Sequence, residues 1–564
     1  MKTIARAVLP FLFLLFLARP VCADELDDLA RDFWSWRAAE MPVSTDDIPR
    51  LERPAGWVPD WSPTAIARYL ADLERFEARW KHFNAAGWPV PRQVDYRLMG
   101  SAIARVRWEL VVNPGWKRNP DFYLDQTLGA YVSLLLQPPP IDAARSQQII
   151  ATLRSFPRTL EAARKNLTEP TAPFAGLALE RLKDPRTLLV NSTAALKPLL
   201  AADAARDLEW AADAAVPALQ SYRVWLTEKL PSLPKETAVG RDAYLFFLKN
   251  VALLPYTPEQ LLEIGHQEWA RSVAWETYEQ HHNAGLPQLS LVPDGQAEIA
   301  RETQAELTIR QFLEAKDILT VPGWVRHYVY LPMPPYLAPF QGSAGEEDDF
   351  TSPSRLHDDG VRYINPPEPN LGYFAATMAK DPRCITVHEG VPGHYFQLVL
   401  SWAHPDPIRR HYYDSGANEG IGFYAEEMML QAGLFDDSRR TREIIASFAR
   451  LRALRVEVDV KLALGKFSLD EAADYLRHSV PMDSHTAQSE AAAFAAGPGQ
   501  AISYQIGKIQ ILCMLAEARR KQGPAFSLRA FHDFVWLNGN VPLSLQRWEY
   551  LGLRDDLDAA DGLR

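Results

Sequence analysis

The chain has 564 residues, with 71 acidic side chains against 60 basic ones and a formal net charge of −11 at pH 7. This balance argues against a nucleic acid as a partner, because phosphate backbones bind basic surfaces. Three cysteines are too few for the disulfide framework of a small secreted domain.

The first element in the chain has the composition of a leader for export. Lys2 gives it a positive start, residues 8–18 form a short apolar run, and small residues end at Ala23. We expect a signal peptide over residues 1–23, cleaved near Ala23, and a mature protein that is periplasmic or secreted. Cys22 offers the alternative of a lipid anchor, although the residues before it make a poor lipobox. No later apolar run is long enough for a transmembrane helix.

Helical signatures run through most of the remaining chain. Ser62 is suited to cap a helix that has Pro63 in its first turn. Thr257 and Ser468 each begin a capping box ahead of apolar residues at helical spacing. No linker, repeat or long charge block divides the sequence. We therefore expect a mainly α, multi-helical body that forms a single domain over residues 24–564.

Residues 321–370 differ from the rest, because they are rich in proline, glycine and aromatic side chains. Residues 327–331 and 361–364 have the composition of short strands. We expect a small β element that lines a substrate cleft, where an extended peptide adds to the strand edge through main-chain hydrogen bonds. The alternative is a surface hairpin without a partner.

His388, Glu389 and His394 carry the groups that metal-dependent hydrolysis requires. Neutral histidine nitrogens hold a zinc ion together with an acidic residue, and a second glutamate acts as general base. The two histidines are six residues apart, which separates them by about 240° and 9 Å on a straight α-helix. Pro392 and Gly393 lie between them and permit a local distortion that brings the two rings together.

Two helices are expected to build this site. The first runs from about residue 382 to residue 402 with a bend at residues 392–393. The second, over residues 418–432, brings Glu419 back to the two imidazoles. Glu426 lies seven residues after Glu419, on the same helical face. It either orients a histidine ligand from behind or is a solvated glutamate.

Four motifs follow one another in the carboxy-terminal part of the chain. They are HExxPGHxxQ at residues 388–397, EGxGxYxE at residues 419–426, PGQAxxYxxG at residues 498–507, and FHD with GxxPL at residues 531–543. On these motifs the chain resembles the DUF885 family of bacterial proteins, which are placed among the gluzincin-type zinc metallopeptidases. The resemblance is specific over residues 388–543, and a weaker similarity extends over most of the mature chain.

The resemblance implies one zinc ion held by His388, His394 and Glu419, with Glu389 as the catalytic base. It also implies that Tyr504 donates a hydrogen bond to the tetrahedral oxyanion. The alternative for Tyr504 is an ordinary half-buried tyrosine. Zinc is inferred from the type of ligand, and another divalent ion would suit the same groups.

Two positions depart from the family pattern. Ala493 stands five residues before Pro498, where the family often has arginine, and Gln505 stands where it often has lysine. If those cations hold a substrate carboxylate, this chain binds its substrate differently. His485 and His532 are further candidates for contacting substrate or oxyanion, with capping or packing as the plainer role of His532.

These features predict an exported zinc-dependent hydrolase that cleaves short peptides, because a helical body that encloses its cleft favours them over folded proteins. Two alternatives remain: a non-catalytic exported binding protein on the same scaffold, and a zinc hydrolase of a non-peptide amide or ester. Replacing Glu389 by glutamine distinguishes an enzyme from a binding protein.

Overall fold

Helices make up most of the computed structural model, as the capping and spacing patterns predict. The structure describes residues 21–41, 51–340, 347–348, 353–365 and 371–563. The expected signal peptide lies outside this part except for residues 21–23, which begin the first helix. Among the described residues, no helix has both the length and the apolar character needed to cross a bilayer.

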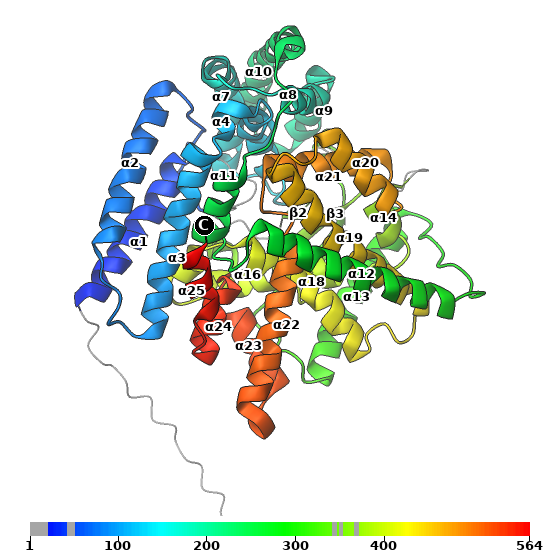
Figure 1. Cartoon of the computed structure of the whole chain (residues 1–564). Coiled ribbons are helices and arrows are strands. Elements are labelled where there is room, and N and C mark those ends of the chain that lie inside the picture. Colours follow the sequence, from blue (N-terminus) through cyan, green and yellow to red (C-terminus); the bar gives the residue numbers. More distant parts are fainter. Residues whose placement is uncertain (1–20, 42–50, 341–346, 349–352, 366–370, 564) are drawn as a thin grey trace, which may run out of the picture.

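The amino-terminal helices form one flank and one end of the molecule (Figure 1). Along the flank lie α1 (Val21–Glu40), α2 (Pro63–His82) and α3 (Val90–Arg107), and α2 begins where Ser62 accepts a hydrogen bond from the Ala65 amide, as predicted. At the end of the molecule α7 packs along α10. The helices that follow α3 in this part are α4 (Gly115–Arg118), α5 (Phe122–Leu124), α6 (Ala130–Ser133), α7 (Ala143–Asn166), α8 (Ala172–Arg181), α9 (Pro185–Leu196), α10 (Ala202–Lys229) and α11 (Arg241–Phe246).

The carboxy-terminal helices carry the four motifs. The capping boxes predicted at Thr257 and Ser468 are both present, at the starts of α12 and α20. Helix α12 packs along α19, and α18 packs along α22. The helices of this part are α12 (Pro258–His282), α13 (Gly295–Ala315), α14 (Tyr373–Met378), α15 (Arg383–Ile385), α16 (His394–Trp402), α17 (Pro407–His411), α18 (Ser415–Ala432), α19 (Arg439–Ala463), α20 (Leu469–Ser479), α21 (Ser484–Ala496), α22 (Ser503–Gln522), α23 (Leu528–Leu537), α24 (Leu543–Leu551) and α25 (Asp555–Gly562).

The small β element has three strands in the order β1-β3-β2. Strand β1 (Tyr328–Pro332) pairs in parallel with β3 (Gly360–Ile364), and β2 (Glu347–Asp348) pairs antiparallel with β3. The parallel pairing means that the two predicted strands do not form the surface hairpin considered as an alternative. Whether a strand edge receives a peptide stays a prediction.

The sheet packs against the segment that carries the first motif. The hydroxyl of Tyr330 donates a hydrogen bond of 3.0 Å to the Thr386 hydroxyl, and the ring of Tyr328 stacks on Tyr395 with 5.2 Å between centroids. Beneath them, apolar side chains of α16, α18, α22 and α23 form one buried core. The segment that carries the first motif therefore packs against the sheet and against the helical core.

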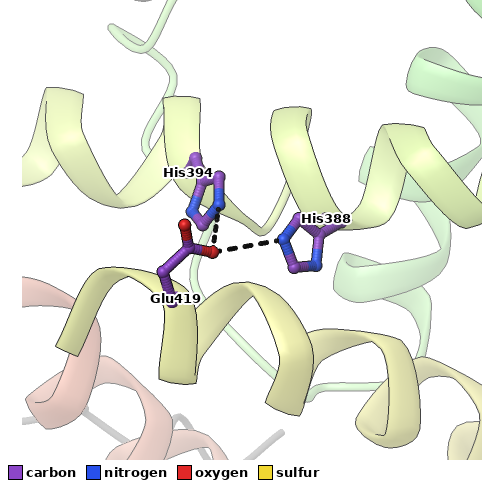
Figure 2. Close-up of side chains that lie close together, drawn as sticks. All are labelled: His388, His394 and Glu419. Atoms are coloured by element: carbon purple, nitrogen blue, oxygen red, sulfur yellow. Dashed lines mark ion pairs between the residues drawn. The ribbon is translucent and has the colours of Figure 1, made fainter. Parts of the chain in front are cut away.

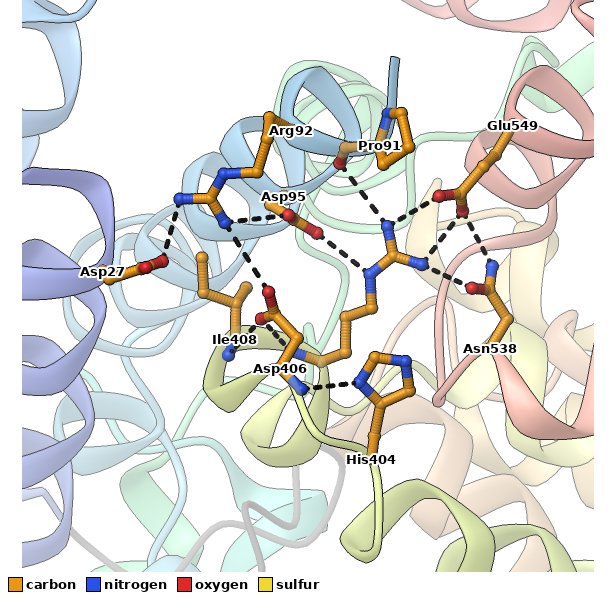
Figure 3. A network of polar contacts seen from close by, with 10 residues as sticks. Asp27, Pro91, Arg92, Asp95, His404, Asp406, Ile408, Asn538 and Glu549 are labelled. Carbon is orange, nitrogen blue, oxygen red and sulfur yellow. Dashed lines mark hydrogen bonds and ion pairs between the residues drawn. The ribbon is translucent and has the colours of Figure 1, made fainter. Parts of the chain in front are cut away.

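A second buried polar feature joins elements that are far apart in sequence. In what we name the Arg409 network, the Arg409 guanidinium lies 2.9 Å from Asp95 on α3 and 2.9 Å from Glu549 on α24. Figure 3 shows how Arg92, Asp27 and the loop before α17 continue the network. The members are Asp27, Arg92, Asp95, Asp406, Arg409, Asn538 and Glu549. It ties the amino-terminal flank to the carboxy-terminal helices.

Candidate metal centre

The segment that carries His388 and His394 is interrupted, not merely bent. After α15 the chain forms a π-helical turn, η8 (Thr386–Gly390), which is closed by a 3.0 Å hydrogen bond from the Val391 amide to the Thr386 carbonyl oxygen. Helix α16 begins afresh at His394. This corrects the expected single helix over residues 382–402, because the backbone leaves the helical path between residues 391 and 393.

Gly393 makes this interruption possible. A Cβ atom at this position would lie 1.7 Å from the carbonyl oxygen of His388, a distance that no side chain tolerates. The chain therefore folds back against its own preceding turn at a residue without a side chain. The result is that the rings of His388 and His394 come together, with centroids 4.7 Å apart and planes at 77°.

Glu419 joins the two histidines from the neighbouring helix α18 (Figure 2). Its Oε2 atom lies 3.0 Å from His394 Nε2 and 3.5 Å from His388 Nε2. The three ligand atoms lie within 4.8 Å of one another. Ligand atoms around a tetrahedral zinc ion with bonds of about 2.0–2.2 Å are roughly 3.3 Å apart, so this spacing suits a metal site.

The surroundings of these groups also fit a bound cation. The Oε2 atom of Glu419 and the Nδ1 atom of His394 are buried without a hydrogen-bond partner in the described structure. Gly422 presents bare backbone to both rings, since a Cβ atom there would lie 2.9 Å from His394 and 3.1 Å from His388. Buried polar atoms normally have partners, and a metal ion would supply the missing one for Glu419.

Glu426 holds His388 from the side opposite Glu419. Its side chain is fully buried, which rules out the interpretation as a solvated glutamate. One carboxylate oxygen lies 2.7 Å from His388 Nδ1 and 3.1 Å from the guanidinium of Arg452. A carboxylate behind a histidine ligand fixes its tautomer and the direction of its other nitrogen. Sequence analysis did not identify Arg452, because it reaches the site from α19 and none of the four motifs contains it.

The carboxylates of this cluster favour a positive charge on the neighbouring imidazoles. Burial by itself would lower the pKa of His388, but Glu419 and Glu426 outweigh it and raise that pKa to about 9. In the same way burial would raise the pKa of Glu419, but His394 and His388 hold it far below its usual range. The carboxylates thus favour the protonated form of both imidazoles, and a divalent cation would take the place of those protons.

Glu389 and Tyr504 lie beside the three ligand residues. The Oε2 atom of Glu389 is 3.9 Å from His394 Nε2, and 26% of its side chain is exposed against 3% for His388. The ring of Tyr504 lies nearly parallel to that of His388, with centroids 6.1 Å apart. Burial and the nearby Glu419 both raise the pKa of Tyr504, so its phenol keeps its proton. Glu389 thus occupies the more open side of the cluster.

The loop before α22 completes the site and contains a group that sequence analysis did not single out. Gln500 donates a long hydrogen bond of 3.5 Å to Glu419 Oε1. Asp459 of α19 anchors this loop by accepting hydrogen bonds from the amides of Gly499 and Ala501, and it also accepts one from the Tyr244 hydroxyl. Burial raises the pKa of Asp459 to about 7. The PGQA motif that contains Gln500 was the available signal.

The structure does not bring His485 or His532 into the cluster. His485 is exposed in the first turn of α21. His532 is buried between Tyr424, whose hydroxyl is 2.9 Å from its Nε2 atom, and the carbonyl oxygen of Ile318, 2.8 Å from its Nδ1 atom. Burial lowers its pKa to about 4. These contacts agree with the packing role considered for His532.

Comparisons with known proteins extend over nearly the whole chain. Residues 50–548 match the family described as "Bacterial protein of unknown function (DUF885)". A solved "putative lipoprotein of unknown function" from Shewanella oneidensis has a TM-score of 0.70 at 16% identity, covering 94% of this chain and 100% of its own. A "putative lipoprotein" from Colwellia psychrerythraea has a TM-score of 0.76 at 17% identity, covering 94% and 98%. None of the curated proteins matches. At these identities the two structures show a shared fold alone.

Proposed function

The chain belongs to DUF885, a family of bacterial proteins of unknown function, and from this premise we propose that it is an exported zinc-dependent hydrolase of short peptides. The observation that carries the proposal is the convergence of His388, His394 and Glu419, whose ligand atoms lie within 4.8 Å of one another. Glu389 lies beside them, 3.9 Å from His394. Export is supported by the leader composition and by the description of both structural neighbours as putative lipoproteins.

Each group has a distinct part in the proposed reaction. His388, His394 and Glu419 would hold a zinc ion, which when bound polarises a scissile carbonyl and makes water more acidic. Glu426, whose carboxylate oxygen lies 2.7 Å from His388 Nδ1, would keep the proton on that nitrogen and so leave the Nε2 lone pair directed toward the site.

Glu389 acts as the base and then as the acid. It accepts a proton from the attacking water as the water oxygen forms a bond to the carbonyl carbon. The carbon–nitrogen bond then breaks, and Glu389 returns the proton to the leaving amine. Tyr504, whose phenol stays protonated because its pKa is raised, donates its O–H to the developing oxyanion.

Replacing Glu389 by glutamine tests this function. We expect Glu389→Gln to lower the rate of peptide hydrolysis by about 10²- to 10⁴-fold, because the general base is lost. It should keep one zinc ion per chain by elemental analysis, because Glu389 is not a ligand. Glu457→Gln is a matched control, since its side chain is 25% exposed and pairs with Lys461 away from the ligands.

The outcomes separate the candidate functions. Equal hydrolysis by the wild type and Glu389→Gln would exclude the proposed mechanism. A folded wild type that takes up no zinc when supplied with it would favour the non-catalytic binding protein. A zinc protein that hydrolyses N-acyl amides or esters but no peptide would have the proposed chemistry on a different substrate class.

A further inference from the structure

A cavity of about 540 Å³ adjoins the candidate metal centre. Tyr504 and Gln500 form part of its wall, and these same residues lie against His388 and Glu419. Substrate-sized sites in proteins have volumes of this order and combine apolar walls with a few polar groups. Here the apolar wall is aromatic and is formed by Trp61, Phe122, Phe174 and Phe494.

The carboxylates that line this cavity all have arginine partners. The pairs are Glu109 with Arg37 at 3.5 Å, Asp121 and Asp125 with Arg181 at 2.8 Å each, and Glu490 with Arg455 at 2.7 Å. Asp121 and Asp125 share Arg181, and Asp121 Oδ1 accepts no hydrogen bond from the described residues, so the pairing is not one to one. Each carboxylate nevertheless has a cation beside it, which makes it a weaker candidate for recognising substrate charge than a charged group without an ion pair.

Arg118 is the exception among the charged groups of the wall. Its guanidinium donates hydrogen bonds of 3.2 Å to Asn113 Oδ1 and to the carbonyl oxygens of Thr237 and Ala238, all of which are neutral. No carboxylate in the described part of the chain forms an ion pair with it. Burial lowers its pKa even though Glu169 and Glu236 act in the opposite direction.

A half-buried guanidinium held only by neutral acceptors is suited to an anionic ligand. The group has five N–H donors, of which the neutral acceptors take three, so two remain for an anion. The three neutral acceptors hold the Arg118 side chain in place, so little conformational entropy is lost when an anion binds. A peptide reaching from the metal centre into the cavity has one obligatory anion, its terminal carboxylate.

We propose that Arg118 binds the C-terminal carboxylate of the peptide substrate, so that this chain is a carboxypeptidase. This inference rests on the proposed function. The scissile bond lies on the Tyr504 side of the cavity, and the released fragment is the part of the peptide that fills the cavity. The aromatic wall favours an apolar side chain at or near the C-terminus of that fragment.

Binding to the inactive Glu389→Gln protein tests this inference without turnover. The probes are Ala-Ala-Phe with a free C-terminal carboxylate and the same tripeptide as its C-terminal amide, titrated calorimetrically. We expect the acid to bind about 10- to 100-fold more tightly than the amide, because the carboxylate forms a charge-assisted hydrogen bond with Arg118 that the neutral amide cannot form. Adding Arg118→Gln should abolish this preference, and Arg118→Lys should restore part of it.

Arg206→Gln is the control, because Arg206 is an exposed arginine of α10 that pairs with Asp203, and it should leave the preference unchanged. Equal binding of acid and amide to the protein with Arg118 intact, no binding of the acid, or a preference that survives Arg118→Gln would each overturn the inference. If circular dichroism shows that Arg118→Gln does not fold, the inference is tested by the ratio of the affinities for acid and amide, measured with Arg118 intact and with Arg118→Lys. Zinc content and hydrolysis by the wild type are measured separately, so failure of the proposed function is recognised independently.

Discussion

Two buried polar clusters in this protein differ in the partners of their carboxylates. In the Arg409 network the guanidinium lies 2.9 Å from both Asp95 and Glu549, and the neighbouring Arg92 pairs with Asp27 at 2.8 Å. In the candidate metal centre, Glu419 has a buried oxygen without a hydrogen bond and faces two imidazoles. The first cluster pairs its carboxylates with arginines, which stay charged, so it has the character of a structural tie. The second pairs Glu419 with imidazoles, which can exchange a proton for a metal ion, so it has the character of a candidate ligand site.

Burial alone therefore does not identify a functional cluster. Asp95 and Glu426 are both buried carboxylates beside an arginine. They differ in their second neighbour. Asp95 also pairs with Arg92, whereas Glu426 lies beside His388, a candidate metal ligand. Removing members of each cluster should therefore change different properties of the protein.

The largest effect is expected from removing a metal ligand. His394→Ala should reduce zinc content from one ion per chain to almost none, because two remaining ligands hold zinc far less tightly than three. Elemental analysis of the dialysed protein measures this. His485→Ala is the matched control, since His485 is an exposed histidine outside the cluster and its loss should leave zinc content unchanged. Full zinc content in His394→Ala would show that the metal lies elsewhere.

The next largest effect is expected in the Arg409 network, and on stability alone. Arg409→Ala should lower the free energy of unfolding by about 3–5 kcal/mol, because Glu549 loses its arginine and buried Asp95 keeps only its ion pair with Arg92. Denaturant titration measures this. Lys165→Ala, which removes an exposed pair with Glu161, should have a far smaller effect, because exposed ion pairs contribute little to stability. Loss of zinc from a folded Arg409→Ala protein would contradict the separation of the two clusters.

A smaller effect is expected from the carboxylate behind His388. Glu426→Gln should weaken zinc binding by about 10- to 100-fold without abolishing it, because Glu426 orients a ligand but does not reach the metal position. Competition with a chelator of known affinity gives the dissociation constant. An unchanged constant would reduce Glu426 to a structural partner of Arg452.

A further effect, on the pH dependence of stability, is expected from Asp459, a buried carboxylate that accepts hydrogen bonds from neutral donors. Its pKa in the folded protein is about 7, against an ordinary value of 3.8. Between these values the folded protein holds a proton that the unfolded chain has released, so stability should fall as pH rises from about 4 to about 7. The slope from this group is at most about 1.4 kcal/mol per pH unit.

Asp459→Asn should remove this part of the pH dependence. Denaturation midpoints at pH 5 and pH 8 should differ less in the variant than in the wild type. An equal difference in the two proteins would mean that Asp459 stays ionised in the fold, as a carboxylate with several amide donors can.

Local sequence patterns predicted the elements that depend on nearby residues. The capping boxes at Thr257 and Ser468 form because their partners lie three residues away, and helical spacing predicted the mainly α body. The first two motifs also predicted the candidate ligands His388, His394 and Glu419, since a motif consists of residue types and their order in the chain. What spacing could not show was how two histidines six residues apart approach each other.

The sequence by itself therefore determined the helical character of the chain and the residue types of its candidate site. The tertiary structure alone decided that β1 and β3 pair in parallel and that Arg452 reaches Glu426. The physical reason is that each of these depends on contacts between segments distant in the sequence. A buried carboxylate and a solvated one look the same in a sequence, and only the fold supplies the neighbours that distinguish them.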